Sequence, residues 1–164
     1  MNERRLLYHR SKMDEATPER LILLIEDCLD VPAEPLLERA KSIASAIEFP
    51  QHRVISIHDG LQAINFLHQR GEYTDAPRPD LILLELNLPG KDGREILAEI
   101  KSSSQLRRIP IIVLTTADSE ADIFNTYALQ GNCHVVKSTD LDQLLAIVKR
   151  IEEFWLGIVT LPVS

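Results

Sequence analysis

The chain has 164 residues, 45% of them apolar, and a formal net charge of −7 with a pI near 5.2. That length predicts one domain that buries roughly two-thirds of its unfolded surface, and the apolar content excludes a chain that is disordered throughout. The acidic balance argues against a partner bound mainly through nucleic-acid phosphates.

The ends of the chain differ in composition from its middle. Residues 1–19 form a polar leader without the apolar core of a secretory signal, and no apolar run is long enough to span a bilayer. Cys28 and Cys133 lack a metal-type spacing, so we interpret them as buried, reduced thiols. We expect a cytoplasmic protein without membrane contact, with its domain at residues 20–156 and a tail at 157–164.

Short apolar runs alternate with amphipathic segments along the domain. Runs at residues 21–26, 53–57, 81–84, 111–114 and 133–136 predict strands, and helical spacing predicts helices that begin near residues 36, 61, 92, 119 and 139. The run at 81–84 is apolar without alternation, which is typical of a strand covered on both faces. Five strands alternating with five helices predict an α/β fold with a doubly wound parallel sheet.

Polar side chains follow four of the predicted strands. They are Glu26 and Asp27 after the first, Glu85 after the third, Thr115 and Thr116 after the fourth, and Lys137 after the fifth. Because right-handed crossovers bring the carboxyl ends of parallel strands to one edge, we expect these groups to form one site. A divalent cation removes the repulsion between clustered carboxylates, and oxygen ligands suit Mg²⁺ better than zinc. Lysine and threonine are suited to contact a phosphoryl group.

These motifs, taken in order, resemble the receiver domains of two-component response regulators over nearly the whole chain. The similarity is closest to the cyanobacterial phytochrome response regulators, in residues 76–80, 92–95, 107–110 and 151–156. The resemblance implies a flavodoxin-like or CheY-like fold with strand order 2-1-3-4-5. It also implies a phytochrome-type histidine kinase as partner and phosphotransfer to the residue at position 85, with Mg²⁺ assisting.

The resemblance further assigns roles to individual residues. Asp27, Glu85 and the main-chain carbonyl of Asn87 would hold Mg²⁺, with Glu26 helping through water. The phosphoryl contacts would be Thr115 and Lys137, with Thr116 as a further candidate.

Glu85 departs from the family, which has aspartate at the phosphoacceptor position. The extra methylene moves the carboxylate by roughly 1.5 Å, and a misplacement near 1 Å can reduce the rate about 10²-fold. One interpretation is that phosphotransfer is lost or weak, because Glu85 reaches Lys137 itself and partly mimics the active state. The domain would then be a phospho-independent pseudo-receiver, a constitutive interaction module. The other interpretation is that Glu85 only fills the pocket as a cation ligand.

Two further positions depart from the family. Ser138 follows Lys137 where the family commonly has a proline, often with a cis bond. His134 replaces the aromatic switch residue, and it either swings between buried and exposed positions or remains a static strand residue.

The last helix and the tail carry more apolar residues than one sheet contact needs. Ile147 and Phe154 lie outside the stripe that ends at Trp155, and Ile158 and Leu161 follow in the tail. The resemblance implies a homodimer through these five residues. The alternative is that the tail folds back on its own domain.

An enzyme or nucleotide binder on the same fold is the remaining class. The sequence has no P-loop, G-x-G-x-x-G turn or nucleophile–base pair. We therefore expect a non-enzymatic, stand-alone regulator that acts through protein contacts.

Overall fold

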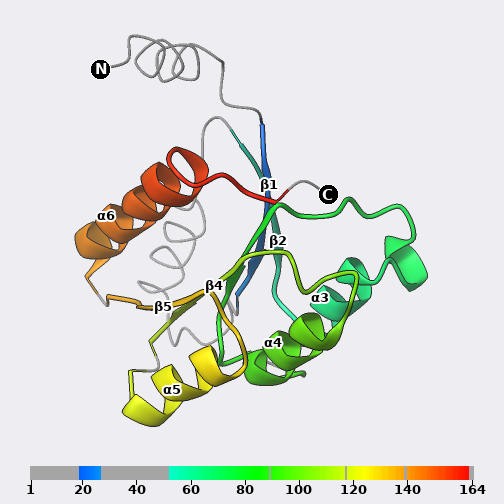
Figure 1. Cartoon of the computed structure of the whole chain (residues 1–164), viewed down its shortest axis with the longest axis horizontal. Coiled ribbons are helices and arrows are strands. Elements are labelled where there is room, and N and C mark those ends of the chain that lie inside the picture. The colour runs from blue at the N-terminus through cyan, green and yellow to red at the C-terminus, as the bar shows by residue number, and fades with distance from the viewer. Residues whose placement is uncertain (1–18, 27–51, 89, 117, 139, 163–164) are drawn as a thin grey trace, which may run out of the picture.

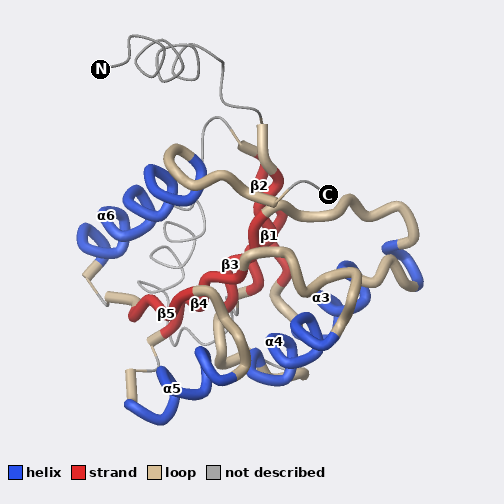
Figure 2. Tube along the Cα trace, in the orientation of Figure 1, coloured by secondary structure: helices blue, strands red, loops and turns tan. Residues whose placement is uncertain are grey.

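A parallel sheet of five strands forms the centre of the domain in this computed structural model, which describes residues 19–26, 52–88, 90–116, 118–138 and 140–162. The strands are β1 (Leu21–Ile25), β2 (Arg53–Ile57), β3 (Leu81–Leu84), β4 (Ile111–Thr115) and β5 (Cys133–Val136). Their order is β2-β1-β3-β4-β5, and every neighbouring pair is parallel. Figure 2 shows these strands as one central layer. The predicted fold and strand order are confirmed.

Helices cover both faces of the sheet. They are α3 (Gly60–Leu67), α4 (Gly93–Ser102), α5 (Glu120–Ala128) and α6 (Leu141–Ile151), with a 3-10 turn at Gly71–Tyr73 and a π-helical turn at Glu152–Leu156. In Figure 1, α6 lies on one side of the sheet and α3, α4 and α5 lie on the other. The helix predicted to begin near residue 36 lies outside the described residues. No helix in the described ranges has the length and apolar character needed to cross a membrane.

The β3 strand explains why its sequence does not alternate. Ile82 and Leu84 belong to the core beneath α3 and α4, whereas Leu81 and Leu83 belong to the core beneath α6. All four side chains are fully buried, because a parallel strand with helices on both faces has no solvent side.

Each described helix begins with a side-chain cap at the carboxyl edge of the sheet. Asp59, Asp92, Ser119 and Asp140 accept hydrogen bonds from main-chain amides of the first turns of α3, α4, α5 and α6. The last cap lies one residue after the predicted helix start near 139: Asp140 caps α6 by accepting from the amide of Gln143. These caps set the loops that surround the strand ends.

The chain after α6 returns to the sheet. Leu161, predicted as a dimer contact, is buried in the same core as Leu144 and Val148. Trp155 also packs against this core, while Ile158 is 74% exposed and Phe154 is 50% exposed. The position of Leu161 supports the alternative that the tail folds back, because a side chain inside its own core is not an exposed interface residue. Figure 1 shows the end of the described chain reaching the region of β1.

Candidate functional site: a carboxylate–lysine cluster

Three main-chain hydrogen bonds hold the ends of the strands together at the carboxyl edge. The amide of Glu85 donates to the carbonyl of Ile25, that of Glu26 to Ile57, and that of Lys137 to Thr115, over 2.9, 3.1 and 2.7 Å. The ladder therefore continues past each strand as the side chains change from apolar to polar. Glu26, Glu85 and Lys137 meet because their backbones are already in register.

The carboxylate of Glu85 is bound on both of its oxygens. Its Oε1 accepts from Thr115 Oγ1 at 2.5 Å and from the amide of Asn87 at 3.1 Å, and its Oε2 lies 3.1 Å from Lys137 Nζ. Only 7% of Glu85 is exposed, and Thr115 is fully buried. The carboxylate thus engages both residues that the resemblance assigned to the phosphoryl group.

Lys137 joins the two acidic side chains. Its Nζ lies 2.9 Å from Oε1 of Glu26, in addition to its contact with Glu85. Burial alone would lower the pKa of the Lys137 ammonium, but the charges of Glu26 and Glu85 and hydrogen bonds to both outweigh burial and raise the pKa above its ordinary value. One cation therefore serves two buried anions.

The remaining predicted ligands contribute less in the described structure. Asp27 lies outside the described residues. Asn87 offers its amide to Glu85, and Thr116 is exposed, with no hydrogen bond to Glu85 in the described ranges. No three His, Cys, Asp or Glu residues among those described are grouped to hold a metal ion. Both oxygens of Glu85 already contact protein donors, namely Thr115, the amide of Asn87 and Lys137.

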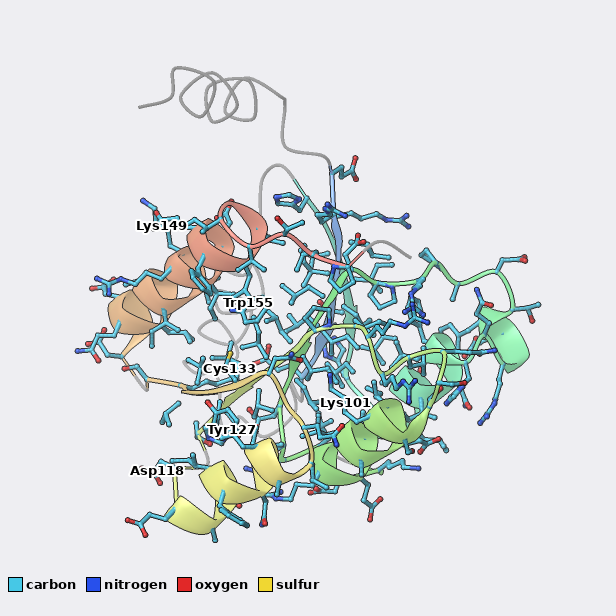
Figure 3. The ribbon with its side chains drawn as sticks, viewed as in Figure 1. Lys101, Asp118, Tyr127, Cys133, Lys149 and Trp155 are labelled. Atoms are coloured by element: carbon cyan, nitrogen blue, oxygen red, sulfur yellow. The ribbon has the colours of Figure 1, made fainter. Side chains whose placement is uncertain are left out.

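His134 is half-buried and held against α5. Its Nδ1 lies 2.8 Å from the hydroxyl of Thr126, which donates to the carbonyl of Asp122. The main-chain amide of His134 donates to the hydroxyl of Tyr127 at 3.3 Å. Figure 3 labels Tyr127 on α5 and Cys133 on the neighbouring β5. Burial raises the pKa of the Cys133 thiol, in keeping with an unreactive cysteine. A switching role for His134 stays a prediction.

The sequence missed an ion pair that links α4 and α5. Arg94 of α4 lies 2.6 Å from Oδ1 of Asp122 on α5, and it also contacts its own helix cap, Asp92. The hydrogen bond to Asp122 raises the pKa of Arg94. Hydrogen bonds from Ser119 and then Arg94 lower the pKa of the Asp122 carboxyl. The sequence predicts a helix start near residue 119, but nothing within that segment indicates that Asp122 pairs with Arg94.

The peptide bond after Lys137 is trans, since the described residues contain no cis peptide bond. The peptide bond after Lys137 therefore differs from the cis arrangement common in the family. The ammonium of Lys137 still reaches the carboxylates of Glu26 and Glu85.

Comparison with known proteins agrees with this geometry. Residues 36–149 match the family described as the response regulator receiver domain, a range that includes Glu85, Thr115 and Lys137. The response regulator Rcp1 of Synechocystis sp. is 48% identical over 151 residues, which cover 92% of this chain and 99% of that protein.

Two solved structures are similar over the same length. The phosphorylated cyanobacterial phytochrome response regulator RcpA has 48% identity and a TM-score of 0.78, and the Mn²⁺-bound form of Rcp1 has 45% identity and a TM-score of 0.76. Each comparison covers 88% of this chain and 99% of the other chain. With the sheet order and the strand-end cluster, these matches lead to one conclusion: the chain belongs to the response regulator receiver family.

Proposed function

We propose that this receiver is phospho-independent, with the carboxylate of Glu85 standing where a phosphoryl group would be held. The observation that carries the proposal is the pair of contacts from Glu85 to Thr115 Oγ1 and Lys137 Nζ. A phosphoryl group needs donors of these two kinds. Here an internal carboxylate already occupies both.

The charge of the cluster supports a fixed state over a switching one. A carboxylate carries one negative charge, whereas a phosphoryl group adds about −1.5 to −2. The single negative charge of Glu85 is enough to hold Lys137 in this cluster, because Glu26 pairs with the same ammonium and adds a second negative charge. A new phosphoryl group would have to break the Thr115 and Lys137 contacts before it could form its own, so we expect phosphotransfer to be lost or very slow.

The partner proposed is a phytochrome-type histidine kinase, because RcpA, which is 48% identical to this chain, is a cyanobacterial phytochrome response regulator. Docking to a kinase does not require phosphotransfer. A receiver held in one state can therefore act as a constitutive interaction module that competes with phosphorylatable regulators for the kinase.

Mg²⁺ binding is proposed at Glu26, Asp27 and the main-chain carbonyl of Asn87, with Glu85 as a poor ligand. Support comes from the Mn²⁺-bound structure of the relative Rcp1 and from the preference of Mg²⁺ for oxygen ligands. Since Thr115 and Lys137 hold both Glu85 oxygens, we expect Mg²⁺ to bind more weakly to this chain than to its Glu85→Asp variant. A Mg²⁺ titration of the thermal midpoint of both proteins tests this order; equal or reversed affinities would contradict it.

The decisive experiment treats the protein, Glu85→Asp and Glu85→Gln with acetyl phosphate and Mg²⁺ and follows intact mass. We expect a phosphoryl adduct on Glu85→Asp, whose shorter carboxylate restores the attack geometry, and none on the other two. An adduct on the unaltered chain that maps to Glu85 and forms as fast as on Glu85→Asp would refute phospho-independence.

Homodimerisation is proposed through the segment that follows α6, with Phe154 and Ile158 as its exposed apolar contacts. Phe154 packs edge-to-face on Trp155 at 5.8 Å between ring centroids, which orients it at the surface. Sedimentation of the variants Phe154→Asp, Ile158→Asp and Phe124→Asp tests whether the dimer forms through this surface or through α5, where Phe124 is 71% exposed. A dimer lost only in Phe124→Asp would move the interface to α5, and a monomeric unaltered chain would rule the dimer out.

A further inference from the structure

A cavity of about 510 Å³ lies at the amino edge of the sheet, away from the carboxylate–lysine cluster. Its walls are the segment at 76–80, which leads into β3, and the segment at 104–110, which leads into β4, and Pro162 of the returning tail borders it. Because β3 and β4 have four and five residues, their length puts roughly 15 Å between this cavity and Glu85. The cavity is therefore a separate site.

The walls of the cavity are joined by their own hydrogen bonds. Arg78 donates from Nη1 to the carbonyl of Gln105 at 2.6 Å, which ties one wall to the other. Gln69 donates to the carbonyl of Ala76 at 2.6 Å. Beneath the second wall, Lys101 donates to the carbonyls of Arg107 and Ile109, each at 3.3 Å; Figure 3 labels Lys101 on α4. These bonds preform the cavity, as is usual for small-molecule sites.

The lining combines an apolar floor with a cationic rim. Leu67, Ala76, Leu106 and Ile109 are at most 8% exposed and form the floor. Arg78 and Arg108 both line the opening.

The positive charge on this rim is not neutralised by the nearest acid. Asp80 also lines the cavity, but it accepts from the amide of Leu21 at 2.8 Å and lies 3.6 Å from Arg20. Within the described ranges Arg108 has no hydrogen bond or ion pair. The rim therefore has positive charge available to bind an anion, and the floor has apolar surface available to contact an apolar group.

We propose that this cavity binds a small amphipathic carboxylate, with its apolar body on the floor and its carboxylate at Arg78 and Arg108. Guanidinium groups pair well with carboxylates because their fork geometry matches two oxygens. The volume falls within the range of about 300–1,000 Å³ that is usual for small-molecule sites. This binding does not depend on the state of Glu85, so the proposal stands apart from phospho-independence.

The test titrates the ¹⁵N-labelled chain with 2-naphthoate, 2-naphthol and acetate and follows amide chemical shifts. The first probe has both features of the proposed ligand, the second lacks the carboxylate, and the third lacks the apolar body. We expect saturable shifts at residues 76–80 and 104–110 with 2-naphthoate, and at least about fivefold weaker binding of each other probe, since an apolar contact and a charged hydrogen bond are each lost in turn.

Arg108→Gln and Arg107→Gln form a matched pair of variants, because both arginines are exposed neighbours and only Arg108 lines the cavity. We expect Arg108→Gln to weaken 2-naphthoate binding about fivefold and Arg107→Gln to leave it unchanged. The proposal is overturned by shifts that do not saturate, by shifts centred on Phe124 and Tyr127, by equal binding of 2-naphthol, or by equal loss in both variants.

Discussion

The two edges of the sheet place charge in opposite ways. At the carboxyl edge, Glu26, Glu85 and Lys137 are at most 14% exposed by side chain and satisfy one another directly. At the amino edge, Arg78 and Arg108 border an open cavity, and the carboxylate among its described lining residues, Asp80, is engaged by Arg20 and a main-chain amide. One edge is electrostatically closed, and the other is open to an anion.

Ligand binding at the amino edge and stabilisation of the fold at the carboxyl edge therefore depend on different residues. A buried ion pair that loses one partner leaves an uncompensated charge, which is strongly destabilising. An exposed arginine loses little when its partner is absent, because water solvates it. Substitutions at the carboxyl edge should therefore act mainly on folding, and those at the amino edge mainly on ligand binding.

The largest effect is expected from Lys137→Met. The free energy of unfolding should fall by about 3–5 kcal/mol, because Glu26 and Glu85 remain buried without their shared cation. Urea denaturation at neutral pH measures the change. Lys101→Met is the matched control, since Lys101 is also partly buried but donates only to carbonyl and amide oxygens. Equal losses in both variants would mean that ion pairing is not what Lys137 contributes.

A smaller loss is expected from Thr115→Val. Removing the hydroxyl takes one hydrogen bond from the buried carboxylate of Glu85, which should lower the free energy of unfolding by about 1–3 kcal/mol. Thr116→Val is the control, because Thr116 is exposed at the next position, and we expect no measurable change there. If Thr116→Val lowers the free energy of unfolding as much as Thr115→Val does, the hydrogen bond to Glu85 is not the reason that Thr115 stabilises the fold.

The pH dependence of stability is expected to report the ion pairing of Lys137. The pKa of Lys137 is raised above its ordinary 10.5 in the folded protein, so the folded state holds this proton more tightly than the unfolded state. The resulting stabilisation is complete below the unfolded pKa and is lost as pH rises through the folded pKa. Urea midpoints of the unaltered chain should therefore fall more steeply above pH ~10.5 than those of Lys137→Met; parallel curves would contradict the shift.

The smallest effect on folding is expected at the amino edge. Arg78→Gln removes one exposed donor to the carbonyl of Gln105, and it should change the free energy of unfolding by less than about 1 kcal/mol. Thermal denaturation measures this. A loss comparable to that of Lys137→Met would show that the hydrogen bond from Arg78 to Gln105 stabilises the fold. The two edges would then not differ in their contribution to stability.

Much of the fold followed from local patterns, and the carboxyl edge followed from topology. The runs at 21–26 and 81–84 predict buried strands, and the crossover rule then predicts that Glu26, Glu85, Thr115 and Lys137 lie together. Of the two threonines predicted at this edge, Thr115 reaches Glu85 and Thr116 is exposed, and the cap of α6 is Asp140, one residue after the predicted helix start near 139. A one-residue difference turns a side chain to another side of the chain, and periodicity alone does not resolve it.

Local patterns predict the strands of the sheet, the family resemblance predicts their order, and the glutamate at the phosphoacceptor position is visible in the chain itself. Contacts between distant segments place Leu161 in its own core, pair Arg94 with Asp122 and enclose a cavity beside Arg78 and Arg108, and no local pattern predicts them. The two groups of features differ in the sequence separation of the residues involved. Strands and caps depend on neighbours a few residues apart, whereas these contacts join segments whose approach is set by how the layers pack.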